Sequence, residues 1–159
     1  MAFIDAFERT LDSKNRTQIP ADFRNAMDPA VHGETFYLCP GERPNTLSLL
    51  PEKYFEELSE YLRTDLLDGE EAESYEILFY SMSRKLDMDK QGRVVLPDRQ
   101  LAMVNIGKEI TFAGVNKRID IWSTEEYRAY IQDEFSANWR RLKQFARTAR
   151  SKRARTPEE

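Results

Sequence analysis

The chain has 159 residues and a formal net charge of −4, and its length suits one ordinary core or two small ones. Its single cysteine excludes an intrachain disulfide, and we expect Cys39 to be a packed strand residue and His32 a loop residue, with no metal site and no cofactor. No apolar run approaches the ~20 residues of a membrane span, and the N-terminus lacks a basic region followed by an apolar one, so we expect a cytoplasmic protein with no membrane partner.

The first predicted element is a short strand over residues 3–11, which enters a tight turn at residues 12–16. Asn15 serves as the turn residue, because Asn and Gly tolerate the left-handed backbone conformation that a tight reversal needs. Residues 17–19 have the pattern of a second strand. Pro20 then closes this strand and opens a short helix over residues 21–27.

The same order of residues returns 77 positions later, where Leu11–Pro20 is repeated as Met88–Pro97. Each copy reads Asp-x-x-x-Arg, followed by apolar positions and a proline, and Gly92 takes the place of Asn15. An internal repeat predicts two similar structural units, and we expect them to share one core. Two copies of a fixed Asp and Arg across a turn favour a paired binding surface over a catalytic centre.

Later segments of the two halves also correspond. Strands are predicted at residues 36–39 and 47–50 in the first half and at 110–113 and 119–122 in the second. The segments at 47–50 and 119–122 show the alternation of half-buried strands. Amphipathic spacing predicts a helix over residues 51–62, and a linking helix is expected over 70–80. Residues 98–104 are the counterpart of the helix at 21–27.

The charge is distributed unevenly. Residues 52–76 have a net charge of −8, for which we favour a solvated helix face, whereas residues 139–156 carry +8 with no acidic residue. Apolar residues follow one another at helical spacing in this basic segment, and we expect disorder after about residue 150. The basic tail attracts DNA non-specifically, contacts acidic surface on a neighbour, or improves solubility; the first role is slightly favoured.

The two Asp-x-x-x-Arg motifs and their flanks resemble the MraZ family of bacterial transcriptional regulators, whose halves are tandem SpoVT/AbrB-type units. The resemblance covers about residues 3–135 and is carried by Thr10–Arg16, Ile19–Arg24, Asp89–Pro97 and Ile119–Ser123. It implies an α+β fold in which two intertwined swapped-hairpin β units form a pseudo-twofold barrel with flanking helices. The units are expected at 3–62 and 81–135, joined by a helical connector at 63–80 and followed by a basic helical extension and disordered tail at 136–159.

The resemblance further implies a sequence-specific regulator that binds double-stranded DNA. The resemblance implies a ring-shaped homo-oligomer that binds short direct repeats upstream of its own operon. This operon belongs to the cluster for cell division and cell-wall synthesis. The expected location is therefore cytoplasmic and nucleoid-associated. Repeated sites read by linked subunits raise affinity through effective concentration, which is a physical reason to expect an oligomer.

The candidate DNA-binding residues are mostly cations in and near the two motifs. Arg16 is expected to reach a base edge, because Arg presents a forked donor to guanine, while neighbouring groups contact the phosphates. The set comprises Arg9, Thr10, Lys14, Arg16, Arg84, Lys90 and Arg93. Asp12 and Asp89 either orient the motif arginines and brace the turns, or form internal ion pairs that staple the hairpins.

The second motif is the weaker prediction. Lys90 stands one place nearer its Asp than Lys14 does, although Arg84 and Lys85 keep the approach strand basic. Arg93 either binds DNA or lies on the opposite face and serves subunit contacts. We therefore expect the first copy to be the main DNA-reading element.

An enzyme and a protein-binding module are the two alternatives to a DNA-binding regulator. With one His, no Gly-rich phosphate loop and no carboxylate pair at metal spacing, we expect no enzymatic activity and no small-molecule substrate. The alternative is an AbrB-type protein-binding module of the antitoxin kind, in which the acidic segment or the tail embraces another protein.

Overall fold

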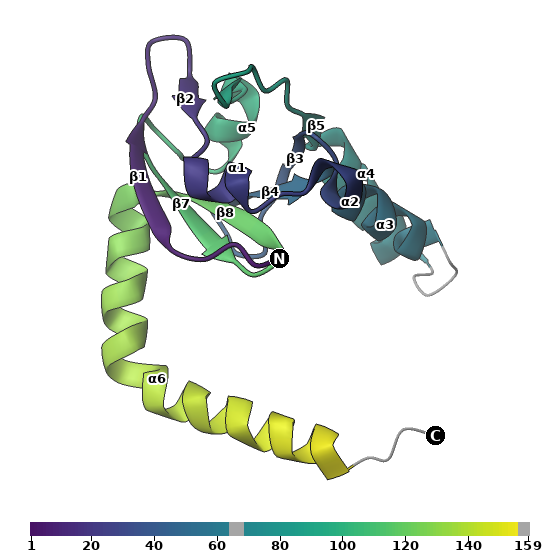
Figure 1. Cartoon of the computed structure of the whole chain (residues 1–159), viewed down its shortest axis with the longest axis vertical. Helices are drawn as coiled ribbons and strands as arrows, with labels where there is room; N and C mark the ends of the chain where they lie inside the picture. The colour runs from purple at the N-terminus through teal and green to yellow at the C-terminus, as the bar shows by residue number, and fades with distance from the viewer. Residues whose placement is uncertain (64–68, 156–159) are drawn as a thin grey trace. The chain divides into compact units, whose positions relative to one another are not determined.

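A six-stranded antiparallel sheet is the largest element of the fold. The computed structural model describes residues 1–63 and 69–155. Across the sheet the strands follow in the order β1 (Ala6–Thr10), β7 (Glu109–Val115), β8 (Arg118–Ser123), β4 (Leu47–Pro51), β3 (Phe36–Pro40) and β5 (Arg84–Lys85) (Figure 1). The strands predicted at 36–39, 47–50, 110–113 and 119–122 are confirmed, each with slightly wider bounds.

The expected closed barrel is wrong, because the sheet is open. Its order ends at β1 on one side and at β5 on the other, and β5 has only two residues. A separate two-stranded ribbon is formed by β2 (Arg16–Gln18) and β6 (Arg93–Val95). The architecture is thus a mixed α+β fold with an open antiparallel sheet and a short ribbon.

Strand pairing crosses between the two halves of the chain. β1 of the first half pairs with β7 of the second, and β5 of the second half pairs with β3 of the first. The halves also meet at the centre of the sheet, where Ser48 of β4 lies opposite Asp120 of β8. There the Ser48 hydroxyl donates a 2.9 Å hydrogen bond to the buried Asp120 carboxylate, which also accepts from Arg118 Nε at 2.9 Å.

Short helices follow the two motif strands. α1 (Ala21–Asn25) and α5 (Asp98–Met103) begin directly after Pro20 and Pro97, whose fixed backbone angle suits the start of a helix. α2 (Pro29–His32) was not expected, so His32 ends a short helix and is not a loop residue. Its sequence nevertheless contains a start signal, since the Asp28 side chain accepts from the Ala30 amide at 3.0 Å and proline follows the cap.

One core contains residues from both copies of the repeat. Ile19 and Phe23 of the first copy and Val94 and Leu96 of the second are all buried in the same apolar cluster, which also contains the inward side chains of the large sheet. The shared core is therefore confirmed. Burial of this cluster, at about 25 cal/mol per Å² of apolar surface, holds the short motif strands in place although each has only three residues.

A smaller apolar cluster lies between the sheet and two helices, α3 (Glu52–Arg63) and α4 (Glu70–Ser81) (Figure 1). Cys39 and Leu50 come from the strands and Phe79 from α4, and the ring of Phe55 stacks on Tyr37 at 4.0 Å between centroids. Cys39 is the buried strand residue that the sequence predicted, and burial raises the pKa of its thiol to about 12.

The chain divides into two compact units, Met1–Thr124 and Glu125–Glu159. The second unit is built on α6 (Thr124–Arg155), a continuous helix of 32 residues that reaches Arg155, past the point where the composition predicted disorder. The last part of the predicted tail lies outside the described residues. None of the described helices combines the length and the apolar character that a membrane crossing requires.

Candidate nucleic-acid interface

The first Asp-x-x-x-Arg motif is a tight turn organised by the carboxylate of Asp12. One carboxylate oxygen accepts from the backbone amides of Lys14 and Arg16 at 2.9 and 2.8 Å, and the other accepts from Arg16 Nε at 2.7 Å. The Asn15 amide donates to the Asp12 carbonyl at 3.0 Å, and Asn15 has the left-handed φ of 58° that its role as turn residue requires.

The second motif repeats this geometry almost atom for atom. Asp89 accepts from the amides of Gln91 and Arg93, both at 2.9 Å, and from Arg93 Nε at 2.7 Å. Gly92 has a φ of 78° at the position of Asn15. The 77-residue repeat is therefore a repeat of structure, with each Asp bonded to the arginine of its own turn.

These contacts favour the ionised carboxylates. The backbone amide and the guanidinium of Arg16 hold the pKa of Asp12 at about 2, below its ordinary value of 3.8. The amide and side chain of Arg93 lower the pKa of Asp89 in the same way. Both ion pairs are solvent-exposed, so their main effect is on the orientation of the arginines and less on the stability of the fold.

The ribbon of β2 and β6 places the two motifs side by side. Thr17 lies opposite Val94, and both are buried, whereas the flanking pairs Arg16 with Val95 and Gln18 with Arg93 are exposed. Because side chains alternate between faces along a strand and directly opposite residues share a face, Arg16 and Arg93 lie on the same exposed face. The alternative in which Arg93 takes the opposite face is wrong.

This face can offer forked cationic donors to an anionic ligand. The side chains of Arg16 and Arg93 are 54% and 57% exposed. Each guanidinium is held at Nε by its Asp, and within the described residues no hydrogen bond engages its Nη atoms. Lys14 and Lys90 are exposed in the adjoining turns. Fixed Nε contacts with available Nη groups suit bidentate recognition of a base edge or a phosphate.

The backbone of each turn is joined to the other motif. The Ile19 amide donates to the Gly92 carbonyl and the Leu96 amide donates to the Asn15 carbonyl, both at 2.9 Å. This reciprocal bonding fixes the separation of the two turns, so the arginine pair is part of a rigid element and not of two independent loops.

Side chains that support the two turns differ. Asn15 donates its amide to Asp98 and accepts from Lys108 Nζ, which anchors the first turn to the second half of the chain. At the second turn, the Arg24 side chain packs directly over Gly92 and donates from Nε to the Ile19 carbonyl at 3.0 Å. A Cβ at residue 92 would displace the Arg24 side chain, and the left-handed φ of 78° also favours glycine at this position.

Three of the predicted DNA-binding residues lie outside the ribbon. In β1, Arg9 donates to the Glu8 carbonyl and lies over the Phe7 ring, and Thr10 donates to the carboxylate of Glu109. Arg84 is exposed in β5, at the opposite end of the sheet order from β1. The structure therefore brings Lys14, Arg16, Lys90 and Arg93 together in one ribbon and its turns, but not these three.

Two residues at this interface were missed. Gln18 shares the exposed face of the ribbon. Lys108 supports the first turn by donating from Nζ to the Asp12 carbonyl at 3.2 Å. Strand alternation from Arg16 would have identified Gln18, two residues further on. No local signal identifies Lys108, because its contacts span more than 90 residues of sequence.

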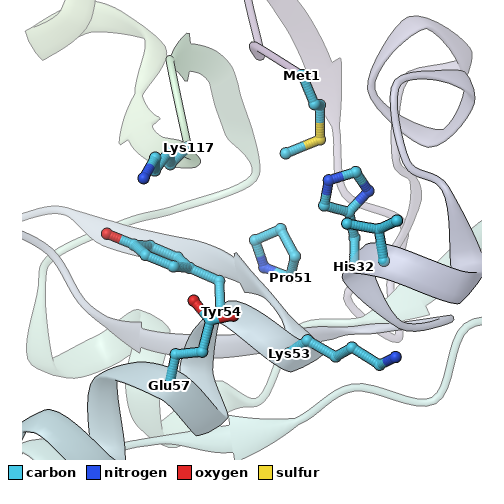
Figure 2. A pocket seen from close by; sticks show the side chains of 8 residues that line it. Met1, His32, Pro51, Lys53, Tyr54, Glu57 and Lys117 are labelled. Atoms are coloured by element: carbon cyan, nitrogen blue, oxygen red, sulfur yellow. The ribbon is translucent and has the colours of Figure 1, made fainter.

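A separate cavity opens beside α2 and α3, as Figure 2 shows. Two of its polar side chains already have partners: the His32 ring accepts from the Asp28 amide at 2.8 Å, and Lys53 donates to the Ala30 carbonyl at 2.7 Å. Lys117 lies over the ring of Tyr54. We therefore treat this cavity as a feature of packing and the ribbon as the candidate site.

Known proteins are similar to this chain over most of its length. A family model of the MraZ protein, whose description includes the term antitoxin-like, matches residues 79–150. A relative from Clostridium tetani is 35% identical over 128 residues, which is 80% of this chain and 86% of the relative. Relatives from Clostridium acetobutylicum and Finegoldia magna are 33% and 31% identical over 86% and 82% of this chain and 92% and 87% of their own lengths. All three are named transcriptional regulator MraZ, and the chain belongs to the MraZ family.

Proposed function

We propose that this chain is a transcriptional regulator that binds double-stranded DNA through the exposed face of the ribbon formed by β2 and β6. The observation that carries the proposal is the pair of arginines on that face, each tethered by its motif Asp and each with Nη groups available. The names of the relatives support the regulatory role.

A two-stranded ribbon fits the major groove of B-DNA, where an arginine can donate two hydrogen bonds to one guanine. Arg16 and Arg93 are the proposed base-reading residues, with equal weight because their turns have the same geometry. Lys14 and Lys90 bind flanking phosphates and fix the register. Asp12 and Asp89 orient the arginines and do not face the DNA themselves, since a carboxylate is repelled by phosphate.

Arg9, Thr10 and Arg84 are proposed as additional backbone contacts. They come from β1 and β5, the strands that lead toward the motifs in the first and second halves. Arg9 and Thr10 already have partners within the chain, so their contribution to binding is smaller than that of the ribbon.

The crossed strand pairing supports a duplicated SpoVT/AbrB-type fold, with swapped-hairpin units at 3–62 and 81–135 and a connector between them. One chain offers a single ribbon with few contacts, which gives weak binding to one site. We propose that a homo-oligomer of ring type reads short direct repeats upstream of its own operon, in the cell-division and cell-wall cluster, because linked sites raise affinity through effective concentration. The protein would then be found on the nucleoid.

A protein-binding, antitoxin-like module is the second candidate, favoured by the description of the matching family model. In that case the chain would bind one protein partner at fixed stoichiometry, and the ribbon arginines would bind its carboxylates. Co-purification of such a partner, without any shift of DNA, would favour this candidate.

A gel-shift experiment tests the proposed function. The full chain is titrated onto the DNA upstream of its own gene and onto a scrambled duplex of the same length. The proposal predicts a shift of the upstream DNA at lower protein concentration than the scrambled DNA, and loss of that preference in Arg16→Ala. Equal affinity of wild type and Arg16→Ala for the upstream DNA would refute the proposed readout.

A further inference from the structure

Helix α6 carries a row of large apolar side chains on its surface. Phe135 and Phe145 are 65% and 73% exposed, and Ile131 and Leu142 are also exposed. Contiguous apolar groups of this size on a helix cost solvation free energy unless another surface covers them.

These residues have the spacing of a helix-pairing seam. Ile131, Phe135, Asn138, Leu142 and Phe145 follow one another in steps of four, three, four and three residues, the heptad pattern that keeps a seam facing a partner helix. Trp139 borders the seam and stacks on Phe135 at 5.8 Å between centroids. The single polar member, Asn138, lies near the middle and donates from Nδ2 to the carboxylate of Glu134 in the same helix at 2.9 Å.

The charge of α6 reverses along its length. Residues 124–138 have a net charge of −3, and residues 139–155 have a net charge of +8. A parallel partner of the same sequence would place the basic halves against each other. An antiparallel partner places each basic half against an acidic half, and the charge pattern is then complementary at both ends.

We propose that α6 pairs with α6 of a second copy of this chain in antiparallel orientation, with the centre of the contact between Phe135 and Asn138. Such a pair has a twofold axis across the seam, so each edge of the seam meets the same edge of the partner helix. Glu134 and Arg141 lie seven residues apart on one edge, each directly before a seam residue. Glu134 of each copy therefore faces Arg141 of the other, and this ion pair occurs twice.

This contact goes beyond DNA binding by the ribbon and does not depend on it. It assigns a role to the basic segment that differs from attraction of DNA phosphates. Lys143, which lies over the ring of Trp139, covers the flank of the seam in each copy. The two apolar layers that flank the centre place Ile131 of one copy against Leu142 of the other.

Cysteine cross-linking of the full chain tests the proposal. In a Cys39→Ala background, the variants are Ile131→Cys, Leu142→Cys and the double variant, each mildly oxidised and examined on a non-reducing gel. The antiparallel pair predicts a covalent dimer in the double variant and none in either single variant. A dimer in the single variants would show parallel pairing, and absence of a dimer in all three would show that a second copy does not cover this face; both results overturn the proposal.

The matched control has the same spacing on the opposite side of the helix. Asp133→Cys with Gln144→Cys is expected to give at least about tenfold less dimer, because disulfide formation requires Cα atoms within about 7 Å. A circular dichroism spectrum for each variant confirms that the helix is retained.

Charge reversal provides a second test, with the double-cysteine variant as its background. Glu134→Arg alone and Arg141→Glu alone each create two like-charge pairs and should lower the cross-linking rate about fivefold at low salt. The combined reversal should restore it to within about twofold. A combined variant that cross-links no faster than Glu134→Arg alone would overturn the facing of Glu134 and Arg141. Both of these variants lack the intrahelical bond from Asn138 to Glu134, so they differ only in the charge at residue 141.

Discussion

Thr17 lies directly opposite Val94 in the ribbon, and Val94 is also the residue that stands 77 positions later at the same place in the repeat. A residue that pairs with its own repeat counterpart marks a local twofold axis. Ser48 and Asp120, counterparts in the later strands, mark the axis a second time at the centre of the sheet. The two arginines are therefore related by this pseudo-symmetry, which is why we give them equal roles in binding DNA.

The acid titration of Asp12 is the first prediction. Because its pKa in the folded chain is about 2 and its ordinary value is 3.8, the native contacts contribute stability above about pH 4 and lose it as the pH falls toward 2. A carbon-detected NMR titration of the Asp12 carboxyl should give a midpoint near 2. In Arg16→Ala the midpoint should rise only part of the way to 3.8, since the backbone amides remain. A wild-type midpoint at 3.8 would contradict the turn geometry.

Substitution of Gly92 should destabilise the fold. In Gly92→Ala the new Cβ displaces the Arg24 side chain, which loses its hydrogen bond to Ile19, and the left-handed φ of 78° adds backbone strain. We expect a loss of about 2 kcal/mol in the free energy of unfolding, measured by urea denaturation. The control is the same substitution in an Arg24→Ala background, where the side-chain hydrogen bond is already absent, and it should lose about 1 kcal/mol from backbone strain alone. Equal losses would show that the Arg24 contact has no energetic role.

The lysines of the two turns should act on affinity without changing sequence preference. Lys14→Ala and Lys90→Ala each remove one proposed phosphate contact, so each should lower the slope of log affinity against log salt by about 0.9. Fluorescence anisotropy at several salt concentrations, on specific and scrambled duplexes, measures both quantities. A change in the preference between the two duplexes with an unchanged salt slope would mean that the lysines read bases.

Local pattern was enough to predict most of the strands and the two motif turns. Alternation identified the strands around Leu47 and Ile119, and the tolerance of Asn15 and Gly92 for left-handed backbone identified the turns. The repeat also predicted the shared core. The strands and turns depend on residues within a few positions of each other, and the repeat is found by comparing two segments of the sequence, so both kinds of signal can be read from the sequence directly.

Long-range pairing could not be predicted from such patterns. Nothing near Arg93 indicates that β6 pairs with β2, and this pairing alone decides that Arg93 shares a face with Arg16. The expected barrel failed for a related reason, since the two-residue β5 provides too little edge to close the sheet. The length of α6 was underestimated because the high charge of its C-terminal residues and their lack of apolar groups favoured disorder.

The most direct test of the central claim compares Arg16→Ala with Arg93→Ala in equilibrium binding to the upstream DNA. Lys117→Ala is the matched control, since it removes one positive charge at the β7–β8 hairpin and leaves the ribbon intact. If both arginines of the ribbon read the DNA, each Arg variant should lose about 10- to 100-fold in affinity for the specific site, and the two losses should agree within about threefold. Lys117→Ala should lose less than about threefold. Wild-type affinity in Arg93→Ala with a large loss in Arg16→Ala would contradict the equivalence of the two motifs, and wild-type affinity in both would contradict the ribbon as the DNA-binding surface.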